Sequence, residues 1–167
     1  MHDQRLVNLL GAAALALTDL MVAATRMPGV STSGAAALVS LRFAPGLSVT
    51  EVGRHIGLTQ SAAARMTDSL VAAGLVTREP GPGREVAVTL TDTGTAAAER
   101  LLAARAESLA DLLAPLTDAE RKGLTTLLTK ILPGVYHRVG NTDLICRLCD
   151  RDTCTTDASC PVGAAAR

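Results

Sequence analysis

Four cysteines gather near one end of the chain, and their thiols are well suited to metal binding. They are Cys146, Cys149, Cys154 and Cys160, with the spacing CxxCx4Cx5C. A Cys-x-x-Cys pair can bind one ion from a tight turn, and two further thiolates can complete a tetrahedral site within a small loop. Such a loop has little core of its own, so metal binding would help to fold it. The spacing therefore predicts a zinc site formed by all four thiolates.

Two other uses of these cysteines stay open. Pro161 follows the last cysteine, as is common in segments that bind iron–sulfur clusters, although the spacing differs from the short ferredoxin pattern. The thiols could instead be redox-active or free. In a reducing compartment a metal site is favoured over disulfides. His137 lies nearby, but at a helix end a histidine is expected to contact backbone carbonyls.

A second set of polar side chains, at the start of a predicted helix, suits DNA binding. Residues 49–76 predict a short helix, a turn at Gly57 and a second amphipathic helix, which is the order of a helix-turn-helix. The first helix braces the second, so that the polar N-terminal turns of the second can enter the major groove. The residues that we expect at the DNA are Thr59, Gln60, Ser61, Ala64, Arg65 and Ser69.

A turn-rich segment, Glu79 to Arg84, lies between two short runs of strand-forming residues. The runs 75–78 and 85–90 predict a β-hairpin. Placed after a helix-turn-helix, this hairpin would form a wing. Arg84 is then expected to reach the minor groove or its phosphates.

Helices on both sides must position these groups. Apolar residues recur at steps of three and four, and the Ser48–Glu51 and Thr117–Glu120 capping boxes mark helix starts. In the fourth helix, Ala62, Met66, Leu70 and Ala73 are expected to face inward. The predicted helices span Asp3 to Arg26, Gly34 to about Arg42, Val49 to Ile56, Gln60 to Ala73, about Asp92 to Leu113, and Thr117 to Pro133-Gly134. The fold class is mainly α with a small β-hairpin wing.

Composition limits the possible functions. A chain of 167 residues and 17.1 kDa suits one compact domain with a short appendage. With one Phe, one Tyr and no Trp among 48% hydrophobic residues, packed helices are favoured over a β-sandwich. Lys and Arg number 16, as do Asp and Glu, so any nucleic-acid site must be a local patch.

The longest apolar stretch runs from Leu6 to Ala24. A membrane span needs about 20 predominantly apolar residues, and Asn8, Thr18 and Asp19 interrupt this one. The same Asp19 argues against a signal peptide. We therefore expect no membrane association and a cytoplasmic location.

Residues 47–94 resemble the MarR family of bacterial winged-helix transcription regulators. The most specific pieces are Arg65, the segment AAGLVTRE after it, Arg84 six residues before Leu90, and Gly94 closing LTDTG. The flanking helices match the family layout in order and length, so the resemblance covers residues 1 to about 139. Family wings commonly carry an Asp two residues before the wing arginine, where this chain has Pro82. The carboxylate that would orient Arg84 is therefore missing.

The resemblance implies a homodimer that reads a palindromic operator in double-stranded DNA, most commonly as a repressor. The first helix and the last two would form an all-α dimerisation unit. A small-molecule effector would bind between that unit and the winged helix. We predict a MarR-like region at residues 1–139, with the winged helix at about 47–91, and a cysteine-rich metal-binding tail at 140–167. The apolar surface of the terminal helices independently favours a dimer.

A different class of function is a metal- or redox-handling protein whose winged helix serves as a protein-interaction scaffold. Apolar residues would then be expected where Gln60, Ser61 and Arg65 stand. An enzyme is not predicted, because the sequence has no phosphate-binding loop and no paired catalytic carboxylates beside a histidine. The sequence favours a DNA-binding regulator.

Overall fold

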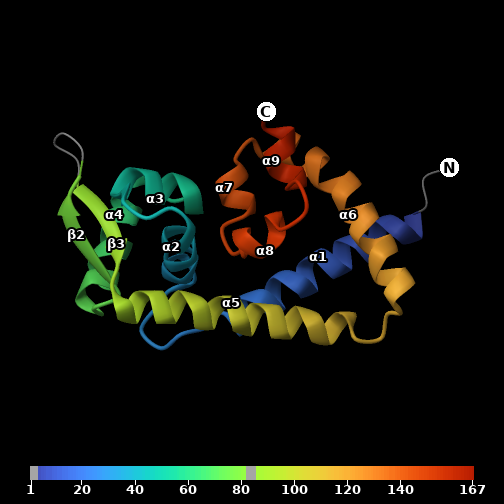
Figure 1. Ribbon diagram of the computed structural model, residues 1–167, viewed down its shortest axis with the longest axis horizontal. Helices are drawn as coiled ribbons and strands as arrows, with labels where there is room; N and C mark the ends of the chain where they lie inside the picture. The colour runs from blue at the N-terminus through green and yellow to red at the C-terminus, as the bar shows by residue number, and fades with distance from the viewer. Residues whose placement is uncertain (1–3, 82–85) are drawn as a thin grey trace.

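The computed structural model describes residues 4–81 and 86–167. Figure 1 shows an elongated molecule in which one long helix, α5, runs beneath the others, with the sheet at one end and α1 and α6 at the other. The elements are α1 (Gln4–Ala24), α2 (Thr32–Phe43), β1 (Leu47–Ser48), α3 (Val49–Ile56), α4 (Gln60–Ala72), β2 (Val76–Pro80), β3 (Val86–Leu90), α5 (Asp92–Leu113), α6 (Asp118–Val139), α7 (Thr142–Ile145), α8 (Arg151–Thr155) and α9 (Pro161–Ala165). The mainly helical fold with a small hairpin is confirmed.

Side-chain caps fix most helix starts where the sequence predicts them. In α3, the Ser48 backbone N–H donates to Glu51 Oε2 over 2.8 Å, and the Glu51 N–H donates to Ser48 Oγ over 3.3 Å. Thr117 and Glu120 form the same box at α6. The backbone hydrogen bond from Ser48 lowers the pKa of Glu51, since it stabilises the carboxylate. The predicted capping boxes are confirmed.

The sheet has three antiparallel strands in the order β1-β3-β2. The predicted hairpin is confirmed, with Val76 opposite Leu90 and Pro80 opposite Val86. Strand β1 is an addition that the sequence did not predict, and it pairs Leu47 with Val88. Two residues are too few to show an alternating pattern. Strand β1 joins the middle of β3 to the start of the helix-turn-helix.

The core surrounds α2, in which every residue from Gly34 to Leu41 is buried. Helices α3, α4 and α5 and the sheet pack around it. The expected inner face of α4 is partly wrong, because Ala73 is exposed, whereas Ala63 and Thr67 are buried. The Thr67 hydroxyl donates to the Ala63 carbonyl over 2.8 Å, so it can be buried without leaving an unsatisfied donor.

Helix α6 continues through Pro133, so the predicted end at Pro133-Gly134 is wrong. Proline removes one backbone donor, but the carbonyl four residues earlier belongs to the exposed Thr129 and can be solvated. The apolar positions continue through Val135 and Val139. The helix ends at Gly140, whose φ of 68° is left-handed and whose N–H donates to the Tyr136 carbonyl over 2.7 Å.

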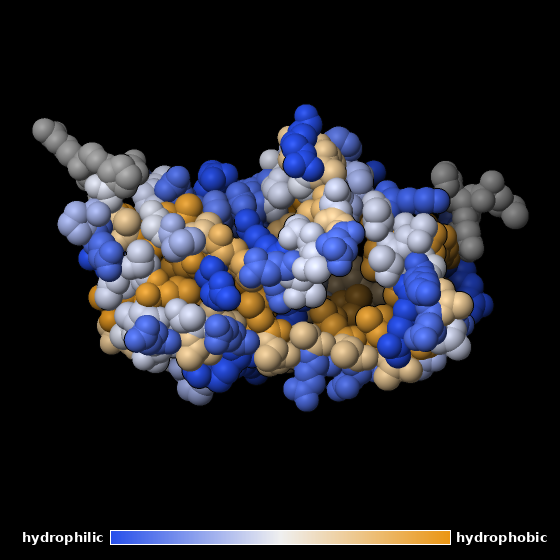
Figure 2. Space-filling view, in the orientation of Figure 1, coloured by the Kyte–Doolittle hydropathy of each residue, from blue (hydrophilic) through white to orange (hydrophobic). Residues whose placement is uncertain are grey.

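Helix α1 contains no buried residue in the single chain. Its large apolar side chains are exposed, with Leu15 at 73% and Leu6 at 61% exposure, and α6 likewise exposes Leu127 at 57%. Figure 2 shows apolar surface around a hollow at the end of the molecule that carries α1 and α6. The excess apolar surface expected of the terminal helices is therefore present.

By length and apolar composition, α1 could span a membrane. The expectation that its polar residues disqualify it is therefore wrong. Arg5 and Asp19 are its only charged residues, and leucine, alanine and valine make up most of the rest. A helix that packs against another protein surface can have the same composition.

Candidate nucleic-acid interface and cysteine segment

Helix α4 presents a polar surface at its N-terminal end. Thr59 caps the helix, with its hydroxyl accepting from the Ala62 N–H over 3.4 Å, and Gln60, Ser61 and Arg65 are exposed. The first backbone N–H groups of a helix have no intrahelical partners and suit a phosphate. This end of α4 can therefore contact both the bases and the backbone of DNA.

The remaining two predicted positions on α4 offer fewer free polar groups to DNA. Ala64 is half-buried, and the exposed Ser69 hydroxyl donates to the Arg65 carbonyl of its own helix over 3.0 Å. Arg84 and Pro82 lie outside the described residues. The roles of all seven predicted DNA-contacting residues stay predictions.

Close packing of α3 against α4 orients the recognition surface. A Cβ at Gly53 would lie 2.9 Å from the Ala63 Cβ and 3.2 Å from the Leu58 carbonyl oxygen, so only glycine allows this approach. Gly57 ends α3 with a φ of 75°, which is left-handed. These two glycines let α3 brace α4 as a helix-turn-helix requires.

Among the described residues, charge pairing leaves Arg65 as the available cation at the N-terminal end of α4. Arg78 on β2 contacts Asp68 on α4 at 2.8 Å, and Arg54 lies 3.5 Å from Asp143. Within residues 4–81 and 86–167, Arg65 has no ion pair. Its guanidinium can therefore contact DNA without breaking an existing interaction.

Comparison with known proteins identifies the family. The sequence profile of the MarR family matches residues 29–85. The MarR family protein Rv2887 of Mycobacterium tuberculosis is 30% identical, with a TM-score of 0.62, over 77% of this chain and 95% of that one. The chain belongs to the MarR family. MarR itself from E. coli, in its apo form, is 28% identical with a TM-score of 0.63, over 77% of this chain and 97% of that one.

A third MarR-family structure, Rv2887 in complex with salicylic acid, is 31% identical with a TM-score of 0.59 and covers 78% of this chain and 98% of that one. None of the curated proteins is significantly similar. The fold is thus that of a MarR-family DNA-binding transcription regulator. The profile match ends before residues 140–167, which we call the cysteine segment.

The cysteine segment is folded but has almost no core. Its three helices have only four or five residues each, and Val162 is its one buried residue. All four cysteines are free thiols, and all four line a cavity of about 180 Å³. The fold therefore brings together the predicted metal ligands around one cavity.

Within that cavity the thiols interact in two pairs. A hydrogen bond with Cys146 lowers the pKa of Cys149 to about 6. The positive charges of Arg105, Arg151 and Arg147 act in the same direction. The same hydrogen bond, with burial, raises the pKa of Cys146. Burial raises the pKa of Cys154, which is also hydrogen-bonded with Cys160. One thiol of the first pair is thus favoured as a thiolate at neutral pH.

The two pairs do not converge on one point. In the described part of the chain, no three His, Cys, Asp or Glu side chains are grouped closely enough to hold a metal ion. A four-thiolate site would therefore need the pairs to close toward each other across the cavity.

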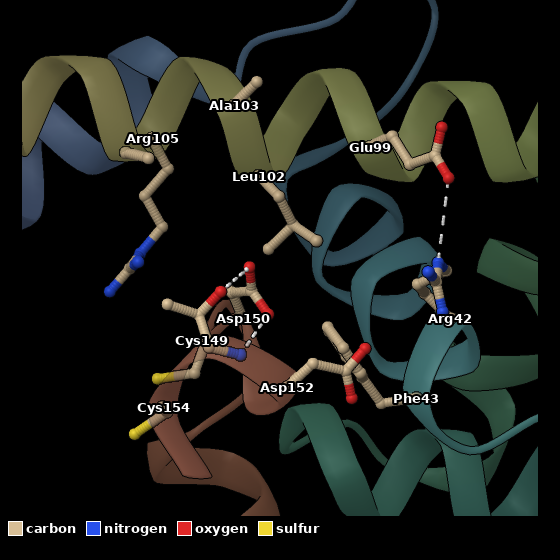
Figure 3. A pocket seen from close by; sticks show the side chains of 12 residues that line it. Arg42, Phe43, Glu99, Leu102, Ala103, Arg105, Cys149, Asp150, Asp152 and Cys154 are labelled. Carbon is tan, nitrogen blue, oxygen red and sulfur yellow. Dashed lines mark hydrogen bonds and ion pairs between the residues drawn. The ribbon is translucent and has the colours of Figure 1, made fainter. Parts of the chain in front are cut away.

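A larger cavity of about 600 Å³ lies between α2, α5 and the cysteine segment. Figure 3 shows Phe43 and Leu102 in its wall and Arg105 extending from α5 on the side of Cys149 and Cys154. Across the cavity, Arg42 lies 3.9 Å from Glu99. The buried Nε of Arg105 has no hydrogen-bond partner in the described part of the chain. This cavity offers an apolar wall and cationic groups to a small molecule.

Sequence patterns missed the contact that joins the cysteine segment to α3. Asp143 Oδ2 lies 3.3 Å from His55 Nε2 and 3.5 Å from Arg54 Nη1. Because Asp143 and His55 are 88 positions apart, no local pattern relates them. The sequence placed His55 only in a helix, whereas the structure buries it at 5% exposure.

We expect His55 to make stability depend on pH. Burial lowers its pKa below 6.5, although Asp143 acts in the opposite direction. The unfolded chain therefore binds more protons than the folded chain below about pH 6.5. The contribution of neutral His55 is present above that pH and is lost as the pH falls through the lowered folded-state pKa.

Urea unfolding between about pH 5 and 7.5 measures this effect. The free energy of unfolding should fall with acid in the wild type and fall less in His55→Gln, which keeps a polar side chain that does not titrate. Equal slopes in the two proteins would contradict the assignment.

Proposed function

We propose that this protein is a sequence-specific transcription regulator that binds a palindromic operator as a homodimer, acting as a repressor in the cytoplasm. The observation that carries the proposal is the exposed set of Gln60, Ser61 and Arg65 at the N-terminal end of α4 in a MarR-type winged helix. A recognition helix of this kind reads base edges in the major groove. Polar residues at these positions disfavour the alternative of an apolar protein-binding scaffold.

Substitutions on α4 test the DNA-binding role. Arg65→Ala and Gln60→Ala should each weaken binding to the protein's own promoter region by about 1–3 kcal/mol if they contact bases. Fluorescence anisotropy with labelled DNA measures the change. Arg100→Ala on α5 removes an exposed arginine outside the recognition helix and should bind like the wild type. Unchanged affinity in both α4 variants would remove these residues from the interface.

Homodimer formation is supported by the apolar side chains exposed on α1 and α6. A second copy would cover them, and two-fold symmetry would present two recognition helices to a palindrome. Sedimentation at micromolar concentration should give the mass of a dimer. Leu127→Lys places a charge on the exposed α6 face and should shift the protein toward a monomer. A monomer mass for the wild type would contradict the proposal.

A small-molecule effector is also part of the proposal. Rv2887 is solved with salicylic acid, and the cavity of about 600 Å³ here has apolar side chains and two arginines in its wall. The wall also holds Glu99, Asp150 and Asp152, so an aromatic carboxylate would bind there through the arginines, with its ring on the apolar side chains. Calorimetric titration with salicylate, in the wild type and in Arg42→Ala, tests this ligand class.

We further propose that the four cysteines form a metal site. Its support is that Cys146, Cys149, Cys154 and Cys160 line one cavity. Zinc suits four thiolates in a small segment, and an iron–sulfur cluster is the alternative. Metal content and the visible spectrum of the purified protein distinguish them, because zinc proteins are colourless and clusters absorb broadly.

A further inference from the structure

The Asp143 carboxylate connects α3 to the cysteine cavity. One of its oxygens contacts Arg54 and His55, as described above, and the other lies 3.0 Å from Arg151 Nη2. Arg151 begins α8 and lines the cavity that the four cysteines share. Because the Asp143 side chain is only 21% exposed, solvent screens these contacts incompletely. A continuous series of polar contacts therefore runs from the helix-turn-helix to the wall of the cavity that the thiols line.

The cysteine segment also contacts the turn that precedes the recognition helix. Leu144 packs on Gly57, where an added Cβ would lie 3.0 Å from the leucine side chain. Asn141 Nδ2 donates to the Arg54 carbonyl over 2.9 Å. Gly57 is three positions before Gln60. A shift of the segment would therefore be transmitted to the N-terminal end of α4.

On its other side the segment contacts α6. Helices α7 and α9 both pack on α6, and Figure 1 shows α7–α9 between α6 and α3. Gln60, Ser61 and Arg65 remain exposed beside the docked segment. The docked arrangement thus fixes the winged helix relative to α6 without covering the recognition residues.

We propose that the four-thiol cavity is a regulatory site, at which a thiophilic divalent cation such as Zn²⁺ orders the cysteine segment between α6 and α3 and raises the affinity of the winged helix for DNA. This inference rests on the metal site of the proposed function and assigns that site a role. Asp143 is a positioning residue, since it lies outside the thiol set and acts through α3 and Arg151.

The physical basis is preorganisation. Helices of four or five residues are not stable alone, and Val162 is the segment's one buried side chain. A cation that joins the two cysteines before α8 to Cys154 in α8 and Cys160 after it would restrict the segment to its docked form, and the displaced thiol protons would pass to solvent. DNA would then bind a winged helix that is already held in place. By linkage, DNA must raise the zinc affinity by the same factor.

Two measurements on the full chain test whether zinc raises DNA affinity through Asp143. Reduced protein is stripped with a chelator and reloaded with zinc, and its affinity for its own promoter fragment is measured by anisotropy. Zinc affinity is measured by competition with a chromophoric chelator. We expect zinc to tighten DNA binding about tenfold in the wild type. In Asp143→Asn, zinc affinity should stay within about threefold, while the zinc effect on DNA falls to about twofold or less.

Matched variants distinguish coupling through Asp143 from a general effect of removing a carboxylate. Asp111→Asn changes an exposed carboxylate on α5 that has no side-chain partner in the described part of the chain, and it should keep the full zinc effect. Leu144→Ala should reduce the effect as Asp143→Asn does. Zinc binding that leaves wild-type DNA affinity unchanged or lowered would overturn the inference but not the metal site. Failure to bind zinc would overturn both, and absence of specific DNA binding in both the zinc-free and the zinc-loaded protein would overturn the proposed function.

Discussion

Replacing Gly94 by alanine is expected to destabilise the fold by about 3 kcal/mol, at the upper end of overpacking effects. An added Cβ would collide with the Leu75 backbone carbonyl, which is not a flexible side-chain end. The same carbonyl accepts a hydrogen bond from the Thr91 N–H over 3.1 Å, and Thr91 Oγ1 donates to the Gly74 carbonyl over 2.7 Å. The collision would therefore disrupt the junction between α4, β2 and the start of α5.

Urea unfolding followed by circular dichroism measures this effect. Gly123→Ala in α6 is the matched control, because nothing lies within 4 Å of its added Cβ. There, alanine should be neutral or stabilising by up to about 1 kcal/mol, as expected for a helix interior. Operator binding should weaken in Gly94→Ala alone, since that junction orients the recognition helix. Equal stability of the two variants would contradict the close approach at Gly94.

Replacing Cys149 by serine should lower zinc affinity by at least about 100-fold, because the free energy of a structural zinc site, roughly 10–16 kcal/mol, is shared among four ligands. Residues after about 140 should then exchange amide hydrogens faster. The winged helix should stay folded, because the segment's one buried residue is Val162. Metal analysis and hydrogen exchange provide the two measurements.

Thr155→Ala provides the control for that substitution. Thr155 lines the same cavity without belonging to the four thiols, so this variant should retain its metal. Wild-type protein that holds neither zinc nor iron, when purified under reducing conditions without chelator, would contradict the metal site. A redox thiol pair at Cys146 and Cys149 would then be the better interpretation.

Local signals predicted the parts of the fold that depend on neighbouring residues. The starts of α3 and α6 could be predicted from short patterns, because each capping box forms between residues three positions apart. The boxes are Ser48 with Glu51 and Thr117 with Glu120. The helix-turn-helix was equally clear, because Gly57 separates two periodic segments. The continuation of α6 through Pro133 was missed because it depends on solvation of a carbonyl one turn earlier.

Long-range contacts explain the remaining differences. Strand β1 exists because Leu47 pairs with Val88, and the burial of His55 depends on the distant Asp143. The cysteine spacing predicted that the four thiols belong together, and all four line one cavity. Their arrangement in two pairs depends on how α7, α8 and α9 pack, and the spacing of the cysteines does not determine that packing.

Because α5 is long, a small tilt of this helix produces a large displacement of the winged helix at its end. Its 22 residues extend from the winged helix toward α1 and α6, and at 1.5 Å per residue they span about 33 Å. Over that arm, a tilt of about 6° at one end displaces the other by about 3.4 Å, which is one base-pair step along B-DNA. A movement too small to alter packing among the terminal helices could therefore shift a recognition helix out of register with its half-site.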